Sequence, residues 1–281
     1  MGTNDLLIRR RMLMQSPKEQ DIDYSQKYFT VTNVSDDAEI ISLYTTFKTN
    51  IKYRLNGGSW ITSNFDQNGY LDIDNFKVGD YLEFSNVGTF SEEGKYTQFD
   101  FSYCNGGLMV VSGNILSLIY GDDFKNHTTL PSDYSYAFSN MFENATLVDL
   151  DASNLILPSN VTPWCYTQMF GASNVIAAPK LPAMVLAERC YSSMFAGCRK
   201  LTTAPDLLAT TLVKRCYYFM FRNCSELNYV KAMFTTTPGR DYTGSWLYGV
   251  SANGTFVKNK DATWNVTSTN GIPSGWTVLT E

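Results

Sequence analysis

Histidine and charged residues are scarce in this sequence. A single histidine, His127, occurs in 281 residues, so metal sites built from several histidines are excluded and only one imidazole base is available. Charged residues make up 17% of the chain, and 22 basic against 27 acidic residues give a formal net charge of −5. Because nucleic-acid binding depends on a basic surface, we expect no nucleic-acid partner.

Long apolar runs and common catalytic motifs are also missing. No segment approaches the ~20 apolar residues that span a bilayer, so we expect no membrane insertion. The stretch from Leu6 to Met14 places its arginines inside the apolar run, unlike a secretory signal. This favours a protein made and folded in a cytoplasm, with export by a route that the sequence does not reveal as the alternative. There is no Gly-x-Ser-x-Gly elbow, P-loop or dinucleotide fingerprint. We expect a protein that is not an enzyme and holds no cofactor.

The second half of the chain contains a repeat. Met-Phe recurs at Met141, Met169, Met194 and Met220, at spacings of 28, 25 and 26 residues. The residue four before each Met is Ala or Cys, the one three before is aromatic, the one four after is small and the one seven after is aliphatic. A period of 20 to 30 residues with such columns is typical of a leucine-rich-repeat solenoid, whose units bury their apolar faces only by stacking. Within a unit we predict a short strand over 201–204 and a helical turn over 189–198.

Five of the six cysteines occur in or beside these repeat columns. An even number of cysteines is compatible with disulfides, but small residues in a repeat column favour buried free thiols that fill tight interior positions. Cys190 and Cys198 are separated by seven residues, which does not fit zinc-ligand spacing, and the equivalent positions in other units hold Ala and Ser. We therefore expect no metal site.

The unit from Cys190 to Pro205, with the sequence CYSSMFAGCRKLTTAP, resembles the repeat of BspA-type leucine-rich-repeat proteins. The segments Gly254 to Val257 and Gly271 to Val278 resemble the ending that follows such arrays. The resemblance covers about residues 134–281. It implies a protein from gut Bacteroidales or their phages, in which such repeats are surface and adhesion modules or virion parts.

The first half alternates between apolar and polar residues, with frequent turn residues. Strands are predicted at Phe29 to Val31, Leu71 to Ile73 and Tyr81 to Phe84, one or two buried strands between Leu108 and Ile119, and a hairpin over 51–62 around Asn56-Gly57-Gly58. We therefore predict a mainly β protein, with an N-terminal β-sandwich followed by a short BspA-like solenoid of strands and short helical turns. The predicted regions are an arm at 1–24, the sandwich at 25–120, the solenoid at 121–235 and a C-terminal cap at 236–281.

The N-terminal arm combines three arginines with apolar residues. A helix or strand folded back on the sandwich would explain it, as would docking on a partner subunit; contact of the arginines with nucleic acid is a third reading. We adopt docking on the capsid or other virion proteins, through Leu6, Leu7, Ile8, Arg9, Arg10, Arg11, Met12 and Leu13.

Catalytic candidates are few. His127 lies beside Asp122 and Asp123 in a predicted junction loop, which favours a solvated histidine over a base. Asp149 and Asp151 would share one face of a strand, so a glycosidase with paired carboxylates remains an alternative. Exposed pairs of this kind are common on repeat surfaces.

Together these features favour a non-enzymatic phage structural protein, a head fibre or capsid decoration assembled in the host cytoplasm and located in the virion. A homotrimer is expected by analogy with virion fibres. The alternative is a BspA-type adhesin on the bacterial surface that binds host or neighbouring-cell proteins or glycans. We predict that the repeat face used for adhesion includes Thr202, Thr203, Asn228 and Tyr229.

Overall fold

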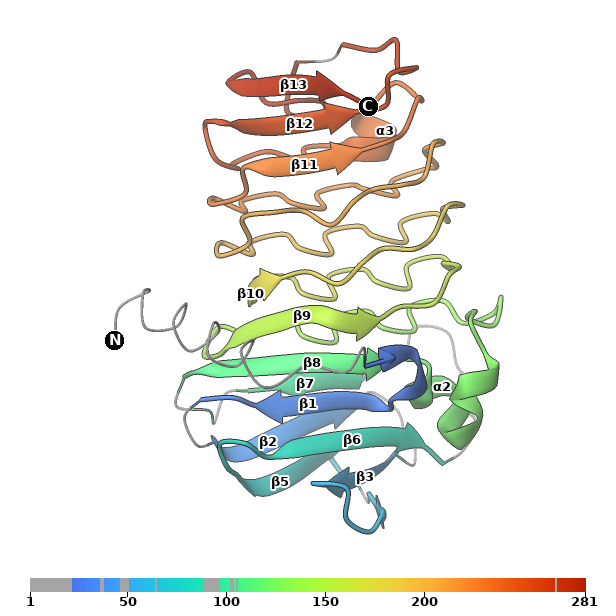
Figure 1. The fold of residues 1–281 in the computed structure, drawn as a ribbon, viewed down its shortest axis with the longest axis vertical. Helices are drawn as coiled ribbons and strands as arrows, with labels where there is room; N and C mark the ends of the chain where they lie inside the picture. Colours follow the sequence, from blue (N-terminus) through green and yellow to red (C-terminus); the bar gives the residue numbers. More distant parts are fainter. Residues whose placement is uncertain are drawn as a thin grey trace.

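The computed structural model describes residues 22–35, 38–45, 51–63, 65–87, 97–101, 104, 106–265 and 267–281. The fold is mainly β, with several sheets and only short helices (Figure 1). The arm residues from Leu6 to Leu13 lie outside the described residues.

Two antiparallel groups of strands form the N-terminal half. The first contains β1 (Phe29–Asn33), β3 (Ile51–Leu55), β4 (Ile61–Thr62), β6 (Tyr81–Asn86) and β8 (Leu108–Asn114). The second contains β2 (Ala38–Thr45), β5 (Tyr70–Phe76) and β7 (Thr97–Asp100). Phe29 and Phe84 from the first group pack against Phe99 from the second, with ring centroids 5.5 and 5.2 Å from Phe99. This aromatic contact joins the two sheets in one core.

The predicted hairpin is present. β3 pairs antiparallel with β4, and Asn56 and Gly57 at its turn have φ angles of 52° and 69°. Two consecutive left-handed residues match the twist of a hairpin, which is why Asn-Gly is favoured there. The prediction for residues 108–119 was only partly right. β8 ends at Asn114, where Gly113 has φ +78°, and a short helix α2 (Ser117–Tyr120) follows, then a 3-10 helix at Gly121–Asn126.

The first sheet continues into the repeats. β8 pairs parallel with β9 (Asp149–Ile156), and β9 pairs parallel with β10 (Asn174–Ala177), giving the seven-stranded order β10-β9-β8-β1-β6-β3-β4. Further along, β11 (Tyr229–Ala232), β12 (Gly254–Lys258) and β13 (Trp276–Thr280) form a second parallel sheet on the same side of the stack (Figure 1). We call this side the strand side. The predicted division at residues 120 and 121 therefore lies within one continuous hydrophobic core.

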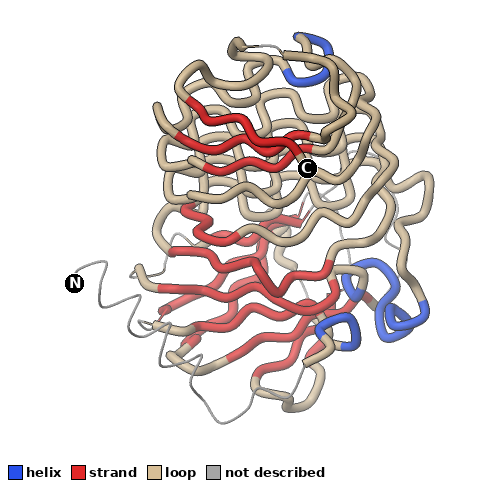
Figure 2. Tube along the Cα trace, turned by 45° about the horizontal axis from the view of Figure 1, so that its top comes forward, coloured by secondary structure: helices blue, strands red, loops and turns tan. Residues whose placement is uncertain are grey.

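The predicted strand at 201–204 is reduced to a single bridge, between Thr203 and Tyr229. The predicted helical turns are wrong. We call the side opposite the strands the turn side. There the described chain runs through successive turns rather than helices, apart from the short helix α3 (Arg240–Thr243) (Figure 2).

Every fourth residue on the turn side has a left-handed backbone. In one unit these residues are Arg189, Ser193 and Gly197, with φ between 54° and 80°. Alternate N–H groups donate to the next unit, as in Arg189 to Lys214 (3.1 Å) and Gly197 to Arg222 (2.7 Å). A helix would satisfy these N–H groups within its own segment, whereas here they bind one unit to the next.

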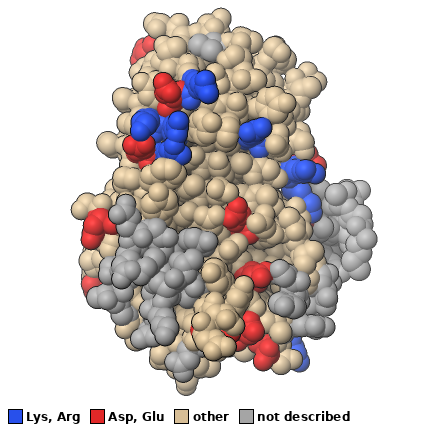
Figure 3. All heavy atoms as spheres, turned by 180° about the vertical axis from the view of Figure 1, so that it is seen from behind, with Lys and Arg blue, Asp and Glu red and all other residues tan. Residues whose placement is uncertain are grey.

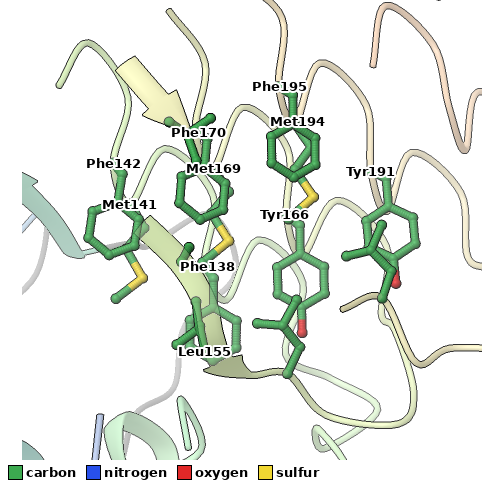
Figure 4. Close-up of a cluster of buried hydrophobic side chains, with 14 of the residues drawn as sticks. Phe138, Met141, Phe142, Leu155, Tyr166, Met169, Phe170, Tyr191, Met194 and Phe195 are labelled. Atoms are coloured by element: carbon green, nitrogen blue, oxygen red, sulfur yellow. The ribbon is translucent and has the colours of Figure 1, made fainter. Parts of the chain in front are cut away.

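The columns read from the sequence form ladders in the interior (Figure 4). Phe142, Phe170, Phe195 and Phe221 stack with ring centroids 5.3 to 5.6 Å apart. Phe138, Tyr166, Tyr191 and Tyr217 form a second ladder, with spacings of 5.6 to 6.0 Å. The methionines and the small residues of each column are buried as well. Each ring is covered by its equivalent in the next unit, so the repeat supplies its own core.

Candidate functional site

The four residues predicted to form an adhesive face lie together on the strand side. The N–H of Asn228 donates to the carbonyl of Thr202 (2.9 Å), and Thr203 is bridged to Tyr229. Thr202, Thr203 and Asn228 are exposed, and Tyr229 is half-buried. The parallel pairing that follows, Tyr229 with Thr255 and Thr255 with Thr277, extends the same row along the sheet. The result is a flat polar row that offers hydroxyl and amide groups.

Charged side chains border this row but pair with one another. Lys231 Nζ lies 2.8 Å from Glu281 Oε1 and 3.9 Å from Asp206 Oδ2. The hydrogen bond to Glu281 raises the pKa of Lys231. These ion pairs neutralise the neighbourhood of the row, so they give it no strong preference for a charged ligand.

A groove of about 380 Å³ opens beside β9, where residues 22–24 cross the strand ends. It is lined by residues 153–157, Ile22, Asp23, Tyr24, Lys180 and Pro182. The lining is mixed in chemistry, with aliphatic side chains beside a lysine, an aspartate and a tyrosine. Nothing in its geometry selects one class of ligand.

Both carboxylates of the alternative glycosidase site, those of Asp149 and Asp151, have hydrogen-bond or ion-pair partners. Asp149 Oδ1 is 2.5 Å from Lys200 Nζ, and Asp151 Oδ1 accepts from the N–H and hydroxyl of Ser153 at 3.0 and 2.6 Å. The two carboxylates do share a face of β9, as predicted. Their partners make each of them a structural group in this arrangement.

His127 lies against its own short helix. Its ring stacks on Tyr120 with centroids 3.6 Å apart, and Nε2 is 2.8 Å from Asp123 Oδ2. Hydrogen bonds from Asn126 and His127 lower the pKa of Asp123. This contact holds the histidine on the surface at the junction between the two halves.

All six cysteines are buried free thiols. Burial raises the pKa of Cys165 and Cys198 to about 12, and that of Cys104 and Cys216 to about 11. Protonated thiols are weak nucleophiles and poor metal ligands. Within the described residues, no group of three or more His, Cys, Asp or Glu side chains is arranged to hold a metal ion.

A cluster that the sequence did not reveal ties the first sheet to the 3-10 helix at 121–126. Arg54 pairs with Glu83 through two hydrogen bonds (2.7 and 3.1 Å), and its guanidinium lies 4.6 Å from the Trp60 ring centre. Lys52 Nζ lies 2.5 Å from Asp122 Oδ2, and the Tyr28 hydroxyl donates to Asp122 (3.0 Å). Because every charge here has a partner, the cluster is structural. The alternation of Lys52 and Arg54 along one strand is the only feature of the sequence that could have indicated this cluster.

A second cluster missed by the sequence analysis lies on the turn side. It combines arginines with aromatic rings: Trp164, Arg189, Arg215, Tyr218, Phe219, Arg222 and Tyr248. We call it the arginine–aromatic cluster. Trp164, Arg189 and Arg215 share one repeat position, directly before a column cysteine, and this shared position was a sequence signal that the analysis did not use.

Among the described residues, no helix is long and apolar enough to cross a membrane. Comparisons with protein-family models, curated proteins and solved structures found no match to this chain.

Proposed function

We propose that this chain is a non-enzymatic structural protein of a phage virion, a head fibre or capsid decoration that displays its repeat half for adhesion. In this proposal the N-terminal half is a β-sandwich and the second half a short solenoid of the BspA-like leucine-rich-repeat type. The arm at residues 1–24 anchors the protein to its particle, and the assembled form is a homotrimer.

The observation that carries the proposal is the continuity of the stack. The parallel pairing of β8 with β9 and the unbroken aromatic ladders link both halves through one core. A chain held in this way is a stiff body, suited to presenting a surface at a distance from its anchor. A virion fibre needs that property.

The state of the chemically reactive groups agrees with a non-enzymatic role. Asp149 is paired with Lys200, His127 is bound to Asp123, and the thiols of the repeat columns are buried. None of these groups faces a site where a substrate could be held by the others. The exposed surface of the repeats offers contact groups rather than catalytic ones.

Particle incorporation tests the proposal. Phage particles purified on a density gradient should contain the full-length chain, and immunogold labelling should place it on the outer surface of the capsid. A version lacking residues 1–20 should fold but be absent from particles. Normal incorporation of the truncated chain would contradict the anchoring role. Absence of the full chain from particles, with protease-accessible protein on bacterial cells, would favour the adhesin alternative.

A further inference from the structure

The arginine–aromatic cluster spans neighbouring units on the turn side. Arg189 Cζ lies 4.2 Å from the Trp164 ring centre, and the Trp164 ring stacks on Tyr136 at 5.2 Å. In the next unit, Arg222 Cζ lies 4.6 Å from the centre of Phe219 and 5.6 Å from that of Tyr248. Cation–π contacts of this kind hold the guanidinium groups flat on the surface and fix their direction.

The arginines are short of anionic partners. Among the described residues, Arg215 and Arg222 form no ion pair, and the buried Nε of Arg222 has no hydrogen-bond partner. Arg189 reaches Glu188 only at 4.0 Å, while that carboxylate is engaged by Lys214 at 2.8 Å. Asp241 is exposed beside Arg215 but makes no ion pair with it among the described residues. The Nε atoms of Arg189 and Arg222 are buried, so an external anion would meet the terminal N–H groups of these arginines rather than Nε.

The stacking brings like charges together. Arg189 and Arg215 occupy the same position in successive units, each just before a column cysteine, and the N–H of Arg189 donates to the carbonyl of Lys214. Like charges on neighbouring rungs of a ladder repel unless an anion compensates them. Glu188 lies near Lys214 and Arg189 (2.8 and 4.0 Å), whereas Arg215 forms no ion pair among the described residues. Figure 3 shows the molecule from behind; the basic side chains visible there lie mainly in its upper part, with acidic side chains among them.

The composition of the cluster selects a class of ligand. Guanidinium groups pair with carboxylates through two parallel hydrogen bonds, and exposed aromatic rings such as Tyr248 pack against the C–H faces of sugars. Nucleic acid carries about one charge per 1.7 Å of duplex and needs a denser basic surface than three arginines on an acidic chain. A polymer with one carboxylate on each sugar ring matches both the sparse charges and the rings.

We propose that the arginine–aromatic cluster is a binding site for a carboxylate-bearing glycan of the polyuronic type. The carboxylates bind Arg215, Arg222 and Arg189, and the sugar faces pack beside the exposed ring of Tyr248. The inference rests on the proposed adhesive function and names the ligand class for it. It moves the adhesive surface from the strand side to the turn side.

The test is isothermal titration calorimetry of the full chain with a hexamer of galacturonic acid at low salt. The methyl-esterified hexamer, which has the same rings without the charge, is the matched ligand control. Arg222→Gln and Arg215→Gln should each weaken binding of the acid about tenfold, because each removes a charge-assisted hydrogen bond. Arg199→Gln, at an exposed arginine outside the cluster, is the charge-matched control and should leave binding unchanged. Circular dichroism checks that the variants fold.

Binding of the acid but not of the ester, lost in the two cluster variants, supports the site. Three results would overturn it: no binding of the acid, equal binding of acid and ester, or equal weakening by Arg199→Gln. Titration with a single-stranded oligonucleotide and with an acidic peptide runs in parallel, and tighter binding of either also overturns the glycan assignment. Particle incorporation is measured separately, so incorporation without glycan binding refutes only this inference, and glycan binding without incorporation refutes only the virion proposal.

Discussion

The phenylalanine ladder should carry much of the stability of the repeat half, and Phe195 is one of its two interior rings. Phe195 is fully buried and nearly parallel to Phe170 and Phe221, with centroids 5.4 and 5.6 Å away. Replacing a buried phenylalanine by alanine costs about 3–5 kcal/mol in transfer and cavity terms. We expect Phe195→Ala to lower the free energy of unfolding by about 4 kcal/mol, because the neighbouring rings are fixed by their own units and cannot collapse into the space.

The measurement is urea unfolding followed by far-ultraviolet circular dichroism and by tryptophan fluorescence. Val185→Ala is the matched control, since Val185 is 82% exposed and its truncation removes little buried surface. It should change the free energy of unfolding by less than about 0.5 kcal/mol. If Phe195→Ala cost no more than Val185→Ala, the ladder would not be the source of stability, and the argument from stacked columns would fail. Both probes should report one transition if the two halves share a core.

Three further outcomes follow from the structure. The free energy of unfolding should fall as pH rises above about 9. The ordinary thiol pKa lies near 9 and burial raises that of Cys165 to about 12, so the folded state holds protons that the unfolded state releases. Urea midpoints at pH 8 and pH 10 measure this fall, and a higher midpoint at pH 10 would contradict it. Gly113→Ala should destabilise the protein strongly, since the added Cβ would lie 1.9 Å from the carbonyl oxygen of Tyr28. Gly79→Ala, with a similar positive φ and open space around it, should cost only about 1 kcal/mol. Thermal melts compare the two variants, and equal losses of stability would refute the steric argument. Removal of residues 1–20 should leave the melting temperature unchanged but convert a trimer to a monomer in light scattering; a monomer before truncation would count against the homotrimer.

The repeat half shows which structural features a periodic sequence can predict. The columns of Met-Phe, Tyr and small residues could be read from the sequence, because each buried side chain in a stack meets its equivalent in the next unit and must resemble it. The backbone conformation of the turn side could not be predicted from the sequence. Some of its left-handed positions hold Asn144, Gly197 and Asn223, residue types that favour this conformation. Others hold Trp164, Arg189 and Phe219, which do not, so local propensity gave an incomplete signal. Hydrogen bonds between units impose that conformation.

The same limit applies to the candidate surfaces. The strand-side row of Thr202, Thr203, Asn228 and Tyr229 could be anticipated, because these residues directly follow the buried column residues Leu201 and Leu227 in two successive units. The arginine–aromatic cluster could be anticipated only in part: Trp164, Arg189 and Arg215 share one repeat position, directly before a column cysteine. The contacts of Arg222 with Phe219 and Tyr248 depend on the turn geometry, which no pattern in the sequence revealed.

By itself the sequence determined the mainly β class, the hairpin at Asn56-Gly57 and the buried columns of the repeats, because all three depend on local turn chemistry or on a fixed period of side-chain burial. The tertiary structure decided how β8 joins β9 in a parallel pair, and which arginines lie beside one another on the turn side. Both depend on hydrogen bonds and contacts between segments distant in the chain. No local pattern encodes the partner of an unpaired strand edge or of an exposed guanidinium group.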